Sequence, residues 1–463
     1  MRRLPCVRCA YLSPVAGLLV GCAVAAIAVI LGGTAVAQQS PAGARAVFEA
    51  THLPPLLTLP GEEVRLTYDV HCGTDGVEDP ERSCDVRGNV LLREGARGPF
   101  RLLPLVRTAA DGLRQLAAVV PPEITSSRDG FGYYAELESS GSDERLVVPA
   151  AGAEAPDQSL PLLSPVDVSL GTHSFGSTRR SVRVAASRWG DGATEVSLES
   201  GRNLPAIGAS AFDVSEDGTI LLLDQAHRRV LRWDRGSANP ASVPLSIDGH
   251  LADMAVDENG SIYVLESVGR PGHAPVVRRF DDNGRELDVV ETAERTPSQI
   301  RIGPDGPVVL QQPSHQWMPV AAGGTPTEPR DQRRGARVGR PLRSDDEVVV
   351  LRRRNEILAG IVAKDRVLRS WRIQSDTALA EVQLAEPVGR RLVLVVRIYS
   401  DNADEFVALV LDQRGVVQRF AIPSAEWAEA APLGRFRLAR GFLYQLGSNA
   451  TGAFVDRYDL EVH

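Results

Sequence analysis

The sequence predicts an all-β protein in which a small antiparallel sandwich precedes a six-bladed β-propeller. Apolar and polar residues alternate with period two in short runs from about residue 53 to 150. From about residue 206 to the end, a strand-turn-strand unit returns roughly every 45 residues, the spacing of propeller blades. No stretch of this repeat region shows helical periodicity.

Length and charge set limits on the class of protein. A chain of 463 residues is too long for one ordinary core, which favours about two to three domains. The formal net charge is −8, and Lys364 is the single lysine among 51 basic residues. The net negative charge argues against a surface that follows nucleic-acid phosphates, so we expect no nucleic-acid partner.

The N-terminal segment predicts export. Basic residues precede an apolar run that ends on Ala35-Val36-Ala37, and no charged residue follows until Arg45. This pattern is typical of a signal peptide at 1–37 with cleavage after Ala37, followed by a linker at 38–52. An uncleaved membrane anchor and a lipid on Cys22 are the alternatives. Each of the three places the body of the protein outside the cytoplasm.

Two cysteines, Cys72 and Cys84, lie outside the targeting segment. In an exported chain they most simply form one disulfide, which in the chain-entropy model stabilises the fold by roughly 3 kcal/mol. A zinc site with the adjacent His71 is the alternative, but two cysteines and one histidine are an incomplete ligand set.

The predicted sandwich covers residues 53–150. Val64, Leu66, Tyr68 and Val70 alternate with polar residues, as in a half-buried strand, and five or six similar runs follow. The last hairpin resembles an immunoglobulin or fibronectin-III module, although the Cys–Trp–Cys core of antibody domains is absent. Residues 151–205 are rich in Pro, Ser and Gly and predict a connector with one strand near 194–200.

The repeat is clearest in its first two units. Asp217-Gly218 and Asn259-Gly260 lie 42 residues apart and predict hairpin turns in which glycine takes a positive φ. An apolar strand follows each turn, and the next strand ends on an aromatic residue that we expect to fill the space between blades. The aromatic positions that predict six blades are Trp233, Phe280, Trp317, Trp371, Phe420 and Tyr458.

These units resemble the NHL-repeat propellers, a branch of the six-bladed TolB-like group. The resemblance covers about 206–463 and depends on Asp213, Asp217-Gly218, Leu222 to Asp224, Arg229-Val230 and Trp233-Asp234, and on their counterparts Asp257, Asn259-Gly260, Tyr263 to Leu265 and Phe280-Asp281. His227 stands where the family usually has Asn, and the third unit carries a long insertion. The resemblance implies a propeller that binds at its loop face, and it implies no single reaction.

No common catalytic motif is present in the sequence, so we assign no catalytic residue. Gluconolactonase-like enzymes have a similar propeller and hold calcium in the central channel. Here the residues expected just ahead of the inner strands are Asp253, Gln299 and Glu347, which are the candidate channel or metal ligands. Polar residues at a wet channel mouth are the simpler interpretation, and Ala211 occupies the same place in the first unit.

Two further features are candidates for a ligand face. His315 and Trp317 could form an aromatic platform, although Trp317 also fits the repeat's core position. The segment 323–343 is rich in Arg, Pro and Gly, includes Arg333 and Arg334, and predicts a mobile surface loop that either contacts anionic polymers or is simply solvated.

We therefore expect an extracytoplasmic binding or scaffold protein, secreted or at the cell surface, and a monomer. Its partner would be an unidentified protein or a cell-envelope polymer, and it would touch a membrane only through its N-terminal segment. We expect no cofactor. The alternative is a hydrolase or lyase that uses Ca²⁺ in the channel.

Overall fold

The computed structural model describes one compact unit, Ala46–His463. Within this unit it leaves out residues 75–76, 79–84, 109–114, 140–144, 201–205, 248, 269–273, 294–295, 313–314, 323–324, 343, 364–365, 425–426, 429–433 and 461–463. The predicted targeting segment and Cys84 lie outside the described residues. Among the residues that are described, no helix is long and apolar enough to cross a bilayer.

Two sheets form the N-terminal part of the unit. The first contains β1 (Ala46–His52), β3 (Val64–Thr74), β8 (Gln115–Val120) and β7 (Val106–Arg107), with β4 (Val77–Glu78) on β3. The second contains β2 (Leu57–Thr58), β11 (Asp157–Pro161), β9 (Phe131–Ser139), β5 (Val86–Glu94) and β6 (Arg101–Pro104), with β10 (Arg145–Val148) on β9. The short helices α1 (Pro122–Thr125) and η1 (Gly152–Glu154) lie in their loops.

The predicted alternation along β3 is confirmed. Val64, Leu66, Tyr68 and Val70 are all buried in a core shared with residues of the second sheet. Strands β1 and β11 extend these sheets beyond residues 53–150 on both sides. Cys72, in β3, is disulfide-bonded, but its predicted partner is not described, so the pairing with Cys84 stays a prediction.

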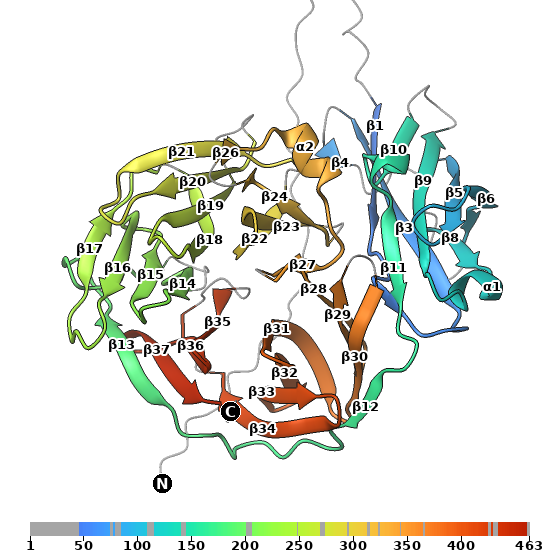
Figure 1. Cartoon of the computed structure of the whole chain (residues 1–463). Coiled ribbons are helices and arrows are strands. Elements are labelled where there is room, and N and C mark those ends of the chain that lie inside the picture. Colours follow the sequence, from blue (N-terminus) through green and yellow to red (C-terminus); the bar gives the residue numbers. More distant parts are fainter. Residues whose placement is uncertain are drawn as a thin grey trace, which may run out of the picture. The chain divides into compact units, whose positions relative to one another are not determined.

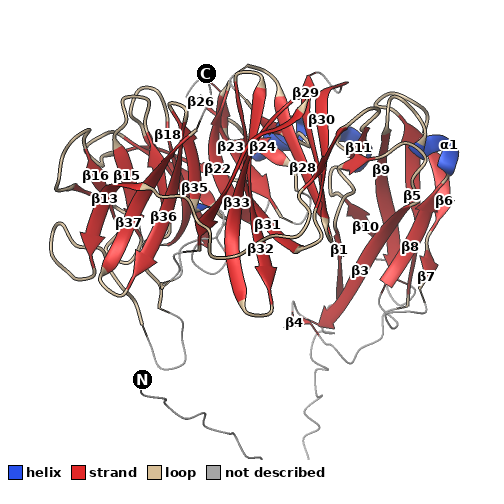
Figure 2. Cartoon of the chain, turned by 90° about the horizontal axis from the view of Figure 1, so that it is seen from below, coloured by secondary structure: helices blue, strands red, loops and turns tan. Residues whose placement is uncertain are grey.

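Six further sheets follow one another around a ring, as a β-propeller requires (Figure 1). Figure 2 shows that almost every element of the chain is a strand. The first sheet contains β14 (Ala211–Val214), β15 (Ile220–Asp224), β16 (Arg229–Trp233) and β17 (Ala241–Pro244). The second contains β18 (His250–Val256), β19 (Ile262–Val268), β20 (Val276–Phe280) and β21 (Glu286–Glu291). The third contains β22 (Pro297–Gly303), β23 (Gly306–Gln311) and β24 (Trp317–Pro319).

The fourth to sixth sheets complete the ring. They are β28 (Glu347–Arg353), β29 (Glu356–Ala363) and β30 (Arg366–Gln374); β31 (Ala378–Val388), β32 (Arg391–Ser400), β33 (Ala403–Asp412) and β34 (Gly415–Pro423); and β35 (Phe436–Ala439), β36 (Phe442–Asn449) and β37 (Gly452–Asp459). The first strand named for each sheet lies toward the centre of the ring (Figure 1). In the fourth sheet the short β27 (Arg340–Pro341) pairs with the inner edge of β28.

The connector supplies outer strands to the propeller. β12 (Val166–Ser169) pairs in parallel with β30 of the fourth sheet. Thr178 forms an isolated bridge to Ala421 of β34 in the fifth sheet. β13 (Val182–Arg188) pairs antiparallel with β37 of the sixth sheet. A strand from before the first blade thus completes the last sheet and closes the ring. The strand expected near 194–200 was misplaced, because that stretch forms only isolated bridges.

The turn chemistry of the first two units is confirmed. Gly218 and Gly260 have φ of 94° and 79°, values that a residue with a Cβ rarely adopts. Five of the six repeat aromatics are buried on the third strands of their sheets. The sixth, Phe420, was misassigned: it lies partly buried on β34, the outermost strand of its sheet, where Arg179 of the connector lies over its ring.

The Arg-rich insertion between β24 and β28 is folded and docked, so the expectation of a mobile loop was wrong. It contains β26 (Thr325–Pro326), α2 (Pro329–Arg334) and β27 (Arg340–Pro341), and β25 (Ala321–Ala322) precedes it. Gln332 of α2 is fully buried and donates to the carbonyls of Glu291 and Thr327, both at 2.8 Å. The buried amide gives this short helix a fixed position that its Arg-rich composition does not suggest.

Candidate functional site

Asp253, a predicted channel ligand, lies on β18 with a side chain that is only 1% exposed. Its Oδ2 accepts hydrogen bonds from Arg301 Nη1 at 2.7 Å and from the Ile300 amide at 3.1 Å. Its Oδ1 accepts from Arg437 Nη2 at 2.8 Å. The two guanidinium groups come from β22 and β35, so Asp253 connects three sheets and its charge is fully compensated.

Asp213 extends this network on β14. Its Oδ2 accepts from the Val256 amide at 2.9 Å, and its Oδ1 lies 3.5 Å from Arg437 Nε. Burial raises the pKa of Asp213, against the opposing effect of Arg437. The network therefore holds neighbouring inner strands together through charge-assisted hydrogen bonds.

The donor set proposed for calcium does not fit that ion. Both oxygens of Asp253 are bound to guanidinium groups, and Glu347 Oε1 accepts from Arg337 Nη1 at 2.8 Å. Gln299 lines a cavity to which neither Asp253 nor Glu347 contributes. Within the described part of the chain, no three His, Cys, Asp or Glu side chains are placed to hold a metal ion. A cation here would have to displace arginines that are already paired.

A cavity of about 410 Å³ lies along the inner strands of the third, fourth and fifth sheets. We call it the blade-seam pocket. Its apolar wall includes Leu53, Leu56, Leu310, Trp317, Val338, Val348, Val350 and Leu384. Its polar side chains are Gln299, Arg301, Gln312, His315, Arg340, Arg352, Glu381, Gln383 and Glu386. An apolar wall with a few polar groups is typical of small-molecule sites.

Gln383 is the most informative polar group of this pocket. Its side chain is 6% exposed, and its Nε2 donates to Glu381 Oε2 at 3.0 Å. Its Oε1 is buried and has no hydrogen-bond partner among the described residues. A buried amide oxygen without a donor costs free energy, and a ligand N–H or O–H would remove that cost.

His315 and Trp317 both line the blade-seam pocket, as does Gln299, so three predicted site residues meet there. His315 has φ of 55°, a left-handed conformation that is unusual for a residue with a Cβ. Burial lowers the pKa of its imidazole, which favours the neutral ring. Trp317 is 8% exposed and mainly packs in the core.

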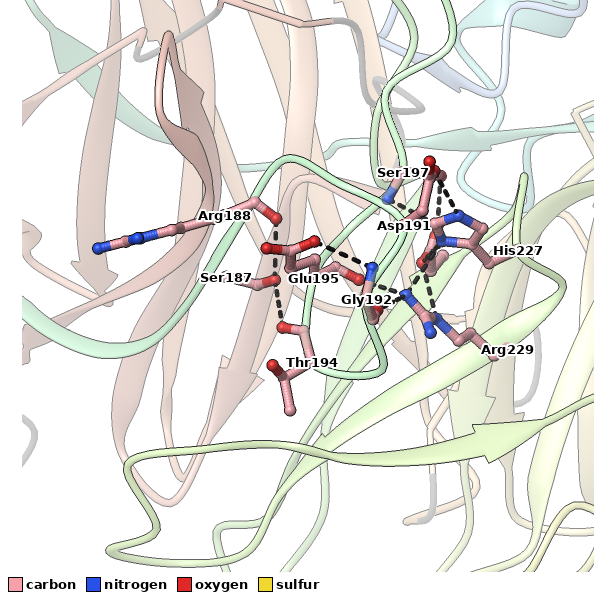
Figure 3. A network of polar contacts seen from close by, with 10 residues as sticks. Ser187, Arg188, Asp191, Gly192, Thr194, Glu195, Ser197, His227 and Arg229 are labelled. Carbon is pink, nitrogen blue, oxygen red and sulfur yellow. Dashed lines mark hydrogen bonds and ion pairs between the residues drawn. The ribbon is translucent and has the colours of Figure 1, made fainter.

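A second polar network centres on Asp224, at the end of β15. Figure 3 shows its members Ser197, His227 and Arg229. The fully buried Asp224 accepts hydrogen bonds from the amide and the hydroxyl of Ser197, from Arg229 Nε at 3.0 Å and from His227 Nδ1 at 2.8 Å. Arg229 also donates to the carbonyls of Gly192 and Glu195. These bonds attach the loop that follows β13 to the first blade.

The residue types of this network are those of a hydrolase triad, but the geometry differs. In a triad the serine hydroxyl is bound to the histidine that removes its proton. Here the Ser197 hydroxyl donates to Asp224, and His227 Nε2 lies 3.3 Å from the exposed Asp191. Within the described residues no histidine contacts the Ser197 hydroxyl, so we interpret the network as structural.

The other two predicted ligand-face residues lie on α2. Arg333 donates from Nη2 to the Ala293 carbonyl at 2.9 Å. It lines a second cavity, which shares Gln312 with the blade-seam pocket. Arg334 is exposed on the surface of the helix. The structure thus brings His315, Trp317 and Gln299 together and leaves Arg333, Arg334, Asp253 and Glu347 elsewhere.

No protein-family model matches the chain, and no curated protein matches it. Among solved structures it is similar to virginiamycin B lyase from Staphylococcus aureus (10% identity, 58% of this chain, 89% of that one, TM-score 0.30). It is also similar to a streptogramin B lyase (14%, 59% and 90%, TM-score 0.33) and to YCF48 from Cyanidioschyzon merolae (11%, 54% and 96%, TM-score 0.30).

These similar structures are β-propeller proteins, and at such identities and scores they bring no activity to this chain. The ring of six sheets, closed by β13, independently identifies the chain as a β-propeller protein. Its most ligand-like feature on the propeller is the blade-seam pocket.

Sequence reasoning missed Arg301, Gln383 and Arg437. Arg301 follows Gln299 by two residues on the same strand, so the spacing in the sequence could have placed it on the same face as Gln299. Gln383 lies on β31, which carries register irregularities between Leu379 and Leu384, so no regular alternation indicates which face it occupies.

Proposed function

We propose that the protein is an exported or cell-surface β-propeller that binds a partner or a cell-envelope ligand and carries out no catalysis of its own. The observation that carries the proposal is the buried Oε1 of Gln383 in the blade-seam pocket, which has no hydrogen-bond partner among the described residues. A group of this kind selects a ligand that donates a hydrogen bond. The apolar wall around it supplies the remaining affinity.

The finer assignments belong to the same proposal. We propose that the propeller belongs to the NHL branch of the TolB-like group, because its first two units carry the quoted residues at matching strand and turn positions. We also propose that the N-terminal sheets are of immunoglobulin type. Their strand order supports this, since β1 pairs antiparallel with β3 in one sheet while β2 pairs in parallel with β11 in the other.

The calcium-dependent alternative is not favoured by any contact in the channel. Its first ligand, Asp253, would have to leave both Arg301 and Arg437. Arg301 and Arg437 would then lose the carboxylate that they share, which costs several kcal/mol because both side chains are buried.

Export can be tested directly on the mature protein. If the segment 1–37 is removed, N-terminal sequencing of the protein from its native host begins at Gln38. A chain that starts at Met1 would indicate an anchor, and one that starts at a lipid-modified Cys22 would indicate a lipoprotein. A cytoplasmic, unprocessed and soluble chain would contradict the proposal.

Binding can be tested with soluble peptidoglycan fragments, monitored by tryptophan fluorescence because Trp317 lines the pocket. We expect a saturable change in the wild type and a loss of binding in Gln383→Met, which keeps the size and removes the acceptor. Gln374→Met, at an exposed position, is the matched control. Equal binding by both variants would contradict a role for the blade-seam pocket.

A further inference from the structure

A second cavity, of about 200 Å³, lies between residues of the N-terminal sheets and residues of the third blade and α2. We call it the Asp157 cavity. Its apolar wall includes Ala50, Leu146, Val147, Val148 and Met318, and its polar side chains are His52, Asp157, Gln312, Gln316 and Arg333. It is smaller than most drug-sized sites, so only a small molecule would fit.

Asp157 is the unusual group in this cavity. It is 2% exposed on β11, opposite Tyr133 of β9. Its carboxyl has one hydrogen bond among the described residues, a long one of 3.4 Å from Gln316 Nε2 to Oδ1. No arginine, lysine or histidine forms an ion pair with it in the described part of the chain. A buried carboxylate without a counter-charge is costly.

The titratable neighbours of Asp157 do not compensate it. His52 Nδ1 bonds the Thr67 carbonyl and its Nε2 bonds the Tyr133 hydroxyl, both at 2.7 Å, while its ring stacks on Tyr68. Burial lowers the pKa of His52 to about 4, so the ring is neutral. Burial also raises the pKa of Asp157 to about 8. In the empty cavity the acid therefore keeps its proton near neutral pH.

A positive group lines the same cavity. Arg333 projects from α2 and is held by its bond to the Ala293 carbonyl. The described contacts of Asp157 do not include this guanidinium. A buried carboxyl group and a guanidinium group thus line one cavity together with an apolar wall.

We propose that the Asp157 cavity binds a small zwitterion of the amino-acid type, with its ammonium at Asp157, its carboxylate at Arg333 and an apolar side chain against the wall. Near neutral pH the acid releases its proton to solvent on binding, and the ammonium then supplies the counter-charge of the carboxylate. The planar guanidinium suits a carboxylate, which it binds through two hydrogen bonds. The Asp157 cavity shares Gln312 with the blade-seam pocket, but this proposal does not depend on the function proposed for that pocket.

Calorimetric titration of the full mature chain with L-leucine tests the proposal. We expect saturable binding, at least about tenfold weaker binding for L-leucinamide, which lacks the carboxylate, and the same for N-acetyl-L-leucine, which lacks the ammonium. L-alanine, titrated in parallel, covers the case in which the cavity admits only a smaller side chain.

Asp157→Asn and Arg333→Gln should each weaken L-leucine binding at least about tenfold. Glu154→Gln and Arg334→Gln, at exposed positions on the same segments, should leave it unchanged. Because Asp157→Asn removes an uncompensated buried acid, this variant should fold. Failure of both amino acids to bind at millimolar concentration, or binding that neither charge change weakens, would overturn the proposal.

Discussion

Asp253 in the propeller and Asp157 in the Asp157 cavity are buried almost equally, at 1% and 2% exposure, yet their surroundings differ. Asp253 accepts from two guanidinium groups and one backbone amide, whereas Asp157 accepts one long bond from a neutral amide. Burial alone therefore does not distinguish a structural carboxyl from a binding one. The presence or absence of a counter-charge within the protein does.

The largest effect is expected for Asp253→Asn. This change leaves Arg301 and Arg437 buried beside a neutral amide, and we expect a loss of about 3–5 kcal/mol in the free energy of unfolding, measured by urea denaturation. Asp305→Asn, at an exposed turn, is the control and should change it little. A loss for Asp253→Asn as small as that of the control would show that the network carries no stability.

The Asp224 network should rank next. Asp224→Asn weakens charge-assisted bonds to Arg229, His227 and Ser197, and we expect a loss of about 2–3 kcal/mol in the same assay. Asp191→Asn removes only an exposed partner of His227 and should cost almost nothing. Equal losses would contradict the distinction between the buried and the exposed carboxyl.

The pH dependence of stability tests the surroundings of Asp157. Folding raises the pKa of Asp157 from 3.8 to about 8, so the folded chain binds the extra proton and the free energy of unfolding falls as pH rises through that window. Folding lowers the pKa of His52 from 6.5 to about 4, which gives the opposite slope between those values. The two slopes offset each other up to pH 6.5.

Above pH 6.5 the His52 slope no longer opposes the slope due to Asp157. We expect its contribution to lower the free energy of unfolding by about 2 kcal/mol between pH 6.5 and 8, measured by urea denaturation at each pH. The Asp157→Asn chain should lack this decline. Tyr68, Tyr133 and Arg333 also face the region, but burial raises the pKa of both tyrosines well above 10. A decline that persists in Asp157→Asn would have another source.

The smallest effect is expected for Gln316→Leu. It removes the single long bond to Asp157, and the free energy of unfolding should change by about 1 kcal/mol or less. If its loss instead approaches that of Asp253→Asn, Gln316 stabilises the Asp157 carboxyl far more strongly than a 3.4 Å bond indicates.

Much of the fold was predictable because its signals are local. The alternation in β3 and the glycine turns at Gly218 and Gly260 depend only on residues that are close together in the sequence. Phe420 was misassigned because a mean spacing of about 45 residues cannot distinguish the third strand of a sheet from the fourth. The outer strands β12 and β13 were missed because their partners lie in blades roughly 200 or more residues later.

The candidate sites were less predictable, since they depend on contacts between distant segments. His315, Trp317 and Gln299 were selected from sequence and do share the blade-seam pocket. Nothing in the sequence around Asp157 indicates a buried acid, because its burial depends on packing against Gln316, 159 residues away. The same is true of the Arg437–Asp253 bond, which joins residues 184 positions apart.

The most direct test compares Asp157→Asn with Asp253→Asn in urea denaturation at pH 8, without ligand. The account predicts opposite signs: Asp157→Asn should gain at least about 1 kcal/mol of unfolding free energy, because it removes a buried acid without a counter-charge, while Asp253→Asn should lose stability. A loss of stability in both variants would contradict the claim that Asp157 is left uncompensated.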